Sequence, residues 1–100
     1  MKIIAVTACP TGIAHTYMAA DALRKEAQRQ GINIKIETQG AMGIENALSA
    51  SDIAGCDLVL IVSDIDIEQS ERFVHCKRLF ATIEETLTNV SSVIQRCLNA

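Results

Sequence analysis

Apolar and polar positions along the chain predict two kinds of β-strand. Residues 2–8 and 57–62 are largely apolar, which is typical of strands buried on both faces of a sheet. Residues 32–36 instead alternate between isoleucine and a polar residue, which is typical of a strand with one exposed face at a sheet edge. A shorter fourth strand is predicted at residues 78–81.

Helical periodicity fills the segments between these strands. Residues 15–30 carry apolar side chains on one face and charged side chains elsewhere, and Gly31 follows where a left-handed residue commonly ends a helix. Shorter helical stretches are predicted around residues 47–54 and 69–74, and residues 40–43 are predicted to form a loop.

The last helix is the most clearly marked. Thr82 and Glu85 form a capping box at its start. Five apolar residues then fall on one stripe at helical spacing, which predicts a single long helix: Ile83, Leu87, Val90, Ile94 and Cys97.

The order of these elements predicts the fold. Strands that alternate with helices form a parallel sheet with right-handed crossovers and helices on both faces. The two buried strands belong at the centre and the alternating strand at an edge, which the strand order 2-1-3-4 satisfies. We therefore predict a single α/β domain over residues 1–100, with a four-stranded parallel sheet. Ligands bind such sheets beyond the carboxyl ends of the strands where the order reverses, here after residues 8 and 62.

Composition narrows the function classes. Apolar residues make up 49% of the chain, which is enough for a core. Nine basic and twelve acidic residues give a net charge of −3, which argues against nucleic acid as the main partner. The apolar run at residues 58–62 is far shorter than the ~20 residues of a membrane span, so we expect no direct membrane insertion.

The cysteines indicate a reducing compartment. Cys9, Cys56, Cys76 and Cys97 are far apart, with no C-x-x-C pair and no histidine at zinc spacing. We therefore expect reduced thiols in a cytoplasmic protein without a metal site. The chain also lacks a nucleotide P-loop and a G-x-G-x-x-G motif, and we expect no cofactor.

The candidate chemistry lies directly after the first strand. Gly12 permits a positive φ, so the loop can form a cup of backbone N–H groups that the start of the next helix completes. Such a cup suits a phosphate and stabilises a thiolate at Cys9, and Thr16 can donate a hydrogen bond to the sulfur. Cys9 is the candidate nucleophile at this cup.

Five further residues are predicted beside this cup. Pro10 directs the strand end toward an extended conformation. Thr38, Gln39 and Gly40 end the second strand on the ligand side and are predicted to face a substrate or a partner. Asp64 follows the second buried strand and is predicted to shape the neighbouring loop.

These residues resemble two related patterns. C-x5-H-T resembles the phosphate loop C-x5-R-[S/T] of the low-molecular-weight tyrosine phosphatase fold, with His15 in place of arginine. The longer string at residues 5–16, with Met18-Ala19-Ala20, resembles the IIB component of fructose-type sugar phosphotransferase systems. Glu37-Thr38-Gln39-Gly40 and Gly43-Ile44-Glu45-Asn46 support the same resemblance, which covers residues 1–66.

The resemblance to IIB components implies a phosphocarrier. Cys9 would take a phosphoryl group from a phosphohistidine on a IIA partner and pass it to a fructose-like sugar bound in a membrane IIC permease. The resemblance also implies that the loop after the cysteine binds the phosphate, which makes six residues candidate phosphate ligands: Thr11, Gly12, Ile13, Ala14, His15 and Thr16. The protein would then be cytoplasmic and held at the inner face of the membrane through IIC.

Two other function classes stay open at this stage. A low-molecular-weight cysteine phosphatase or arsenate-reductase-like enzyme would use the same loop. Such a phosphatase needs an arginine for the phosphoryl group and an acid in an Asp-Pro pair, whereas position 15 is histidine and the only proline is Pro10. A module that binds anions without covalent chemistry is the third class.

Overall fold

The fold is described by a computed structural model, which places residues 1–9 and 14–100. In chain order they form β1 (Lys2–Ala8), α1 (Ala14–Arg29), β2 (Asn33–Gly40), β3 (Gly43–Glu45), α2 (Ala50–Ala54), β4 (Leu58–Ser63), the 3-10 turn η1 (Ser70–Phe73), β5 (Arg78–Ala81), α3 (Ile83–Thr88) and α4 (Val90–Leu98).

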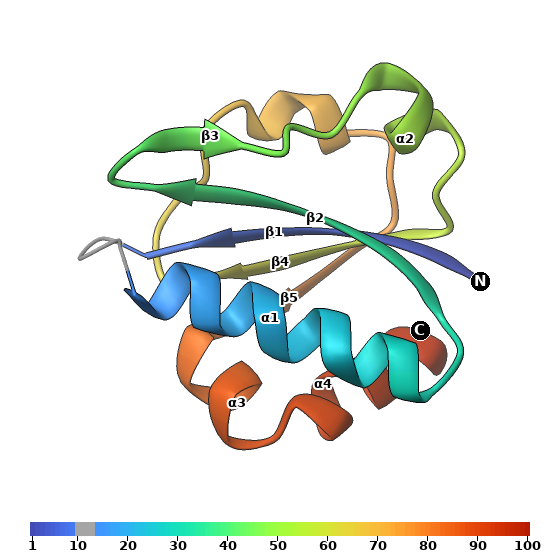
Figure 1. The fold of residues 1–100 in the computed structure, drawn as a ribbon. Coiled ribbons are helices and arrows are strands. Elements are labelled where there is room, and N and C mark those ends of the chain that lie inside the picture. Colours follow the sequence, from blue (N-terminus) through green and yellow to red (C-terminus); the bar gives the residue numbers. More distant parts are fainter. Residues whose placement is uncertain (10–13) are drawn as a thin grey trace.

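Within these residues the sheet has five strands in the order β3-β2-β1-β4-β5 (Figure 1). β2, β1, β4 and β5 are parallel and follow the predicted order 2-1-3-4. The two largely apolar strands, β1 and β4, are central as predicted, because each is flanked by a strand and covered on both faces.

The prediction of four purely parallel strands is wrong, because β3 adds an antiparallel strand. It pairs with the end of β2, with Gly40 beside Gly43 and Thr38 beside Glu45. Gly43 has φ +89°, which a residue with a side chain rarely adopts and which lets the chain reverse after Met42. The end of β2 is therefore not a sheet edge, and the loop predicted at residues 40–43 is a tight hairpin turn.

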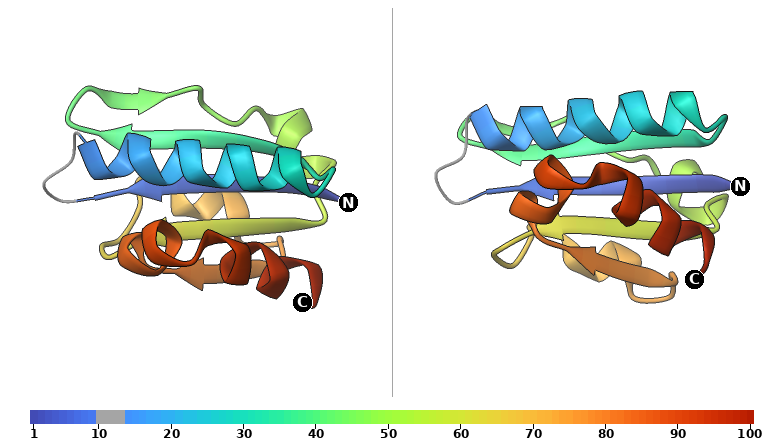
Figure 2. Two further views of the ribbon diagram at one scale, coloured as in Figure 1. Left: turned by 60° about the horizontal axis from the view of Figure 1, so that its bottom comes forward. Right: turned by 90° about the horizontal axis from the view of Figure 1, so that it is seen from below.

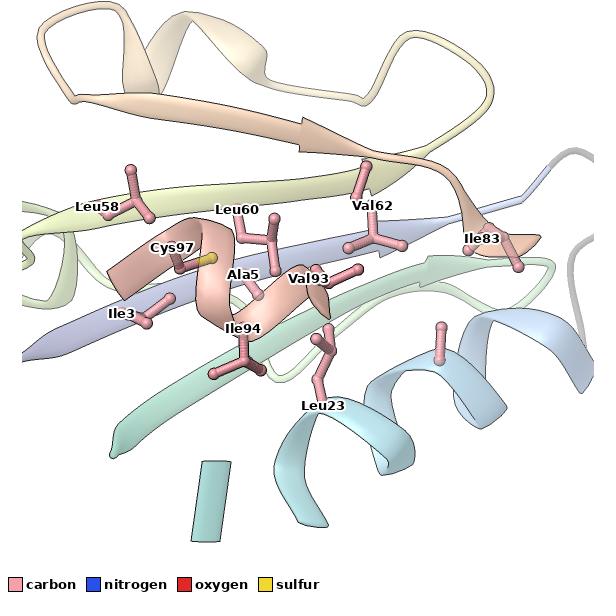
Figure 3. Packing of buried hydrophobic residues seen from close by; sticks show 12 residues of the cluster. Ile3, Ala5, Leu23, Leu58, Leu60, Val62, Ile83, Val93, Ile94 and Cys97 are labelled. Carbon is pink, nitrogen blue, oxygen red and sulfur yellow. The ribbon is translucent and has the colours of Figure 1, made fainter. Parts of the chain in front are cut away.

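Helices cover both faces of the sheet. α1, α3 and α4 lie on one face, and α2 and η1 lie on the other (Figures 1 and 2). Odd-numbered β1 residues point to the first group, where Ile3 and Ala5 pack against Leu23 of α1 and Ile94 of α4 (Figure 3). Even-numbered β1 residues, such as Ile4, point to the second group. This alternation decides which face each functional side chain reaches.

The predicted long C-terminal helix is broken into α3 and α4. The capping box is confirmed, with the Thr82 hydroxyl accepting from the Glu85 amide at 3.1 Å and the Glu85 carboxylate accepting from the Thr82 amide at 2.7 Å. Asn89 has φ −152° and ψ 65°, and its side chain accepts from the Ser92 amide at 3.3 Å. An asparagine that caps a new helix thus interrupts the apolar stripe. Ile83, Ile94 and Cys97 still reach the same core cluster.

Candidate functional site

The candidate nucleophile lies at the carboxyl end of the central strand. Cys9 follows the last residue of β1, is half-buried, and packs against the core cluster between the sheet and α1. α1 begins at Ala14 on the same side of the sheet (Figure 1). Pro10, Thr11, Gly12 and Ile13, which were predicted to complete the loop, lie outside the described residues.

The first turn of α1 supplies the other described candidates from the loop. Ala14 and His15 are exposed, whereas Thr16 is fully buried. The Thr7 hydroxyl donates to the Thr16 carbonyl at 3.2 Å, which ties the start of the helix to the end of β1. The Thr16 hydroxyl itself has no hydrogen-bond partner among the described residues.

A second buried hydroxyl lies on the same face of the sheet. Thr38 is 5% exposed, and its hydroxyl also has no partner within residues 1–9 and 14–100. It lies beside Thr7 in the register of β1 and β2, so both side chains point to the α1 face. Cys9 is two residues beyond Thr7, and its packing places it on this face too.

These hydroxyls point to a ligand because burying a hydroxyl without a partner costs about 1–3 kcal/mol. Thr16 and Thr38 approach the end of β1 from different elements, one from α1 and one from β2. A hydroxyl can donate a hydrogen bond to an anion, and such a bond is stronger than one to a neutral acceptor. The structure thus brings Cys9, Thr16 and Thr38 to one face at one end of the sheet.

Gln39 has a different environment from its neighbour Thr38. Its side chain is buried on the opposite face, where its amide nitrogen donates to the Glu68 carbonyl at 3.0 Å. Its amide oxygen accepts from the Glu68 backbone amide at 2.7 Å. Gln39 therefore holds the segment after β4 and is not exposed to a partner at the surface. Gly40, at the end of β2, is half-buried and belongs to the β2–β3 hairpin.

Gln39 also belongs to a buried charge network that the sequence did not reveal. Glu37 is fully buried and accepts two hydrogen bonds from Arg72 of η1, both at 2.9 Å. It also accepts from the Gln39 amide at 2.8 Å and from the Leu48 backbone amide at 2.9 Å. Burial alone would raise the pKa of Glu37, but the hydrogen bonds from Arg72, Gln39 and Leu48 together lower it.

This network was missed for a physical reason. In the alternating pattern of residues 32–36, Glu37 continues the polar face, which was predicted to be exposed. η1 covers that face at its carboxyl end, and Arg72 from η1 compensates the buried charge. No spacing in the sequence connects Glu37 with Arg72.

Asp64 follows β4 and therefore lies at the same end of the sheet as Cys9, beyond the carboxyl ends of the strands. It is exposed and lines a cleft of about 770 Å³ together with Ile65, Asp66 and Phe80. The bend after β4 is held by Ser63, whose hydroxyl accepts from the Ile65 amide at 3.0 Å and donates to the Ile65 carbonyl at 2.6 Å. Among the described residues, the side-chain hydrogen bonds that hold this bend thus come from Ser63 and not from Asp64, while Gln39 holds the loop further along at Glu68.

Apolar side chains are exposed on α1 and on the hairpin. Met18 is 53% exposed and Met42, in the turn between β2 and β3, is 78% exposed. The Tyr17 hydroxyl donates to the Glu45 carboxylate and thereby connects α1 with β3. This hydrogen bond, with burial and the Glu45 charge as smaller causes, raises the pKa of Tyr17.

Among residues 1–9 and 14–100, no group of three or more His, Cys, Asp or Glu side chains is arranged to hold a metal ion. In the same part of the chain, no helix has the length and apolar character required to cross a membrane.

Comparisons with known proteins point to one type of protein, although its members are named for different sugars. A family model described as "PTS system, Lactose/Cellobiose specific IIB subunit" matches residues 4–96, where PTS denotes the phosphotransferase system. The fructose-like EIIB component 2 of Escherichia coli (strain K12) is 44% identical over 95 residues, which are 95% of this chain and 90% of that protein. The fructose-specific EIIABC component of Bacillus subtilis (strain 168) is 41% identical over 98 residues, which are 98% of this chain but only 15% of that protein.

A solved structure gives the same result. The crystal structure of "Predicted Fructose Specific IIB from Escherichia Coli" superposes with a TM-score of 0.90 and 41% identity, over 95% of this chain and 84% of that one. The family model and the individual proteins name different sugars. The individual proteins, which are 41–44% identical to this chain, are named for fructose.

Proposed function

The chain belongs to the IIB components of fructose-like sugar phosphotransferase systems, and from this premise we propose that Cys9 is the residue that carries the phosphoryl group. One observation carries the proposal: Cys9 shares one face and one end of the sheet with the buried hydroxyls of Thr16 and Thr38. Neither hydroxyl has a hydrogen-bond partner among the described residues. A phosphoryl group on the Cys9 sulfur gives these hydroxyls an acceptor on the α1 face.

The transfer proceeds in two displacements at phosphorus. In the first, the Cys9 thiolate attacks the phosphorus of a donor phosphohistidine whose second ring nitrogen is protonated, a P–S bond forms, and the P–N bond breaks to release neutral imidazole. In the second, a sugar hydroxyl attacks the same phosphorus, a P–O bond forms, and the P–S bond breaks to regenerate the thiolate. The hydroxyl proton leaves to solvent or to a base of the permease. Positioning and charge stabilisation supply most of the catalysis in such transfers.

The phosphoryl oxygens are bound by hydrogen-bond donors around Cys9. Backbone amides of Thr11, Gly12, Ile13 and Ala14 are the proposed donors, with those of His15 and Thr16 at the start of α1. The positive end of the helix dipole favours the thiolate and the transferred group. When water attacks the phosphoryl group, histidine at position 15 stabilises the charge on that group less than arginine would. Slow hydrolysis suits a carrier more than a phosphatase.

The proposed partners are a IIA phosphohistidine donor and a membrane IIC permease for a fructose-like sugar. Support comes from the relative in Bacillus subtilis, whose name joins A, B and C components in one chain. The exposed Met18 and Met42 side chains are candidate contacts for these partners. We propose a cytoplasmic location, with the protein held at the membrane through IIC and without inserting into it. Pro10 and Asp64 complete the proposed rim of the site.

Phosphoryl acceptance by single cysteine variants tests the proposal. Wild-type protein, Cys9→Ser and Cys97→Ser are incubated with a phosphorylated fructose-type IIA protein, and intact mass is measured. Wild type and Cys97→Ser should each gain one phosphoryl group, whereas Cys9→Ser should gain none. Cys97 is a matched control because its thiol is fully buried in the core.

Two results would contradict the proposal. Full labelling of Cys9→Ser would exclude Cys9 as the acceptor. Continuous release of inorganic phosphate by the wild type without sugar or permease would identify a phosphatase instead of a carrier.

A further inference from the structure

Two other cysteines lie together at the end of the sheet opposite to Cys9, where the strands begin. Cys56 precedes β4 and Cys76 precedes β5, so both lie at the amino ends of neighbouring parallel strands. Both are half-buried thiols, and both pack against the core cluster on the η1 face, which includes Val59 and Phe73. They are twenty positions apart in the chain, and only the sheet brings them together.

The strand register places the two cysteines within reach of a disulfide. Val59 lies beside Arg78, so one step back along both strands puts Leu58 beside Lys77. A second step puts Cys76 beside the residue that follows Cys56, so the two cysteines are diagonal neighbours. The Val59 amide donates to the Lys77 carbonyl at 2.9 Å, which confirms this register. Strand spacing and rise give a diagonal of about 6 Å. Cα atoms joined by a disulfide are ~4.4–6.8 Å apart, so the backbone already has a suitable separation.

The surroundings leave this pair accessible to a small molecule. Both cysteines line a cleft of about 680 Å³ that also receives Arg72, His75 and Lys77. The Cys56 thiol donates to the Ile53 carbonyl at 3.2 Å, and burial together with the nearby Cys76 thiol raises the pKa of Cys56.

We propose that Cys56 and Cys76 form a reversible intramolecular disulfide, a second thiol site that reacts with small disulfides such as oxidised glutathione and is separate from the phosphoryl site. The register, the shared cleft and the shared core cluster carry this inference. It does not depend on any role of Cys9.

The exchange needs only an external disulfide as oxidant. The Cys76 thiolate attacks one glutathione sulfur, a mixed disulfide forms, and the first glutathione leaves as a thiolate. Cys56 then loses its proton and attacks the Cys76 sulfur, and the second glutathione leaves. Two electrons pass from the protein thiols to glutathione, and the two thiol protons end on the two reduced glutathione molecules. Cys76 acts first because the raised pKa of Cys56 keeps that thiol protonated.

Peptide mapping can test this pairing without ambiguity, because trypsin places each cysteine in its own peptide. These peptides are residues 3–24 for Cys9, 36–72 for Cys56, 73–77 for Cys76 and 97–100 for Cys97. The full chain is incubated with graded mixtures of reduced and oxidised glutathione, quenched with acid and alkylated. After digestion without reductant, peptides 36–72 and 73–77 should be joined, with the loss of two hydrogen atoms.

Matched variants control the experiment. The linked product should exceed glutathione adducts at these positions by about tenfold or more in wild type and in Cys97→Ser, since its second step is intramolecular. In Cys56→Ser, Cys76 should stop at a glutathione adduct. Glutathione retained on both cysteines of the wild type, or a link between two chains, would overturn the proposal. Because no phosphoryl donor is present, a failure of the proposed phosphocarrier role would not affect this result.

Discussion

Replacing Arg72 by leucine should destabilise the protein by an amount that depends on pH. Arg72 supplies two of the four hydrogen bonds to the Glu37 carboxylate, and it is the cation that compensates this buried charge. The Glu37 side chain is 0% exposed and that of Arg72 is 18% exposed. Leucine retains part of the packing but leaves a buried carboxylate without a cation.

The magnitude follows from the burial of the pair. Breaking a buried ion pair by removing one partner costs about 3–5 kcal/mol. Because Arg72 is partly exposed, solvent screens the pair to some extent, and we expect a loss near the lower limit, about 3 kcal/mol at neutral pH. That is roughly a hundredfold in the folding equilibrium, out of a total stability of about 5–15 kcal/mol.

The pH dependence separates charge from packing. In wild type the lowered pKa of Glu37 adds stability above the unfolded value of ~4.3, and this stability is lost as pH falls through the folded pKa. Without Arg72, burial becomes the dominant influence and raises the folded pKa. The variant then loses stability as pH rises from the unfolded pKa toward the folded one. The difference in the free energy of unfolding between wild type and Arg72→Leu should therefore be large at neutral pH and small in acid.

Guanidinium unfolding followed by far-UV circular dichroism, repeated between pH 4 and pH 7, measures this difference. Glu37→Gln combined with Arg72→Leu should recover part of the loss at neutral pH, because the buried charge is removed. Arg24→Leu is the control, since Arg24 pairs with Asp21 at 2.8 Å on the surface and is 62% exposed, so its loss should have no measurable effect. A loss in Arg72→Leu that is equal at every pH would refute the electrostatic reasoning. It would assign the effect to the hydrogen bond from Arg72 to Gln69 and to packing over the Phe73 ring.

Two further predictions concern the phosphoryl site. Thr38→Val should leave the denaturation midpoint unchanged or raise it, because it removes a buried hydroxyl without a partner among the described residues, and it should slow phosphoryl transfer through Cys9. Transfer at the wild-type rate, with Thr38→Ser as the control, would exclude a donor role for this hydroxyl. His15→Arg should shorten the lifetime of the phosphorylated protein without sugar or permease, because a guanidinium stabilises charge on the group that water attacks. An unchanged lifetime would show that histidine at this position does not limit hydrolysis.

The sequence alone determined the parallel part of the fold and the location of the candidate site. Strands β1 and β4 are largely apolar, and β2 begins as an alternating strand, so burial and strand order followed from residues close together in the chain. The residues after β1, from Cys9 to Thr16, include the helix start and the cysteine whose pattern resembles that of the family. Helix capping at Thr82 and helix termination at Gly31 are equally local, and both are confirmed.

Only the tertiary structure decided which distant residues meet. β3 has three residues and no periodicity of its own, and it exists because the end of β2 offers it hydrogen bonds. Asn89 breaks the last helix although the apolar stripe continues across it. The Glu37–Arg72 ion pair and the neighbouring Cys56 and Cys76 each join segments at least twenty positions apart. The contribution of such contacts to stability depends on burial and on the distances that sheet packing sets. No local pattern in a sequence contains those quantities.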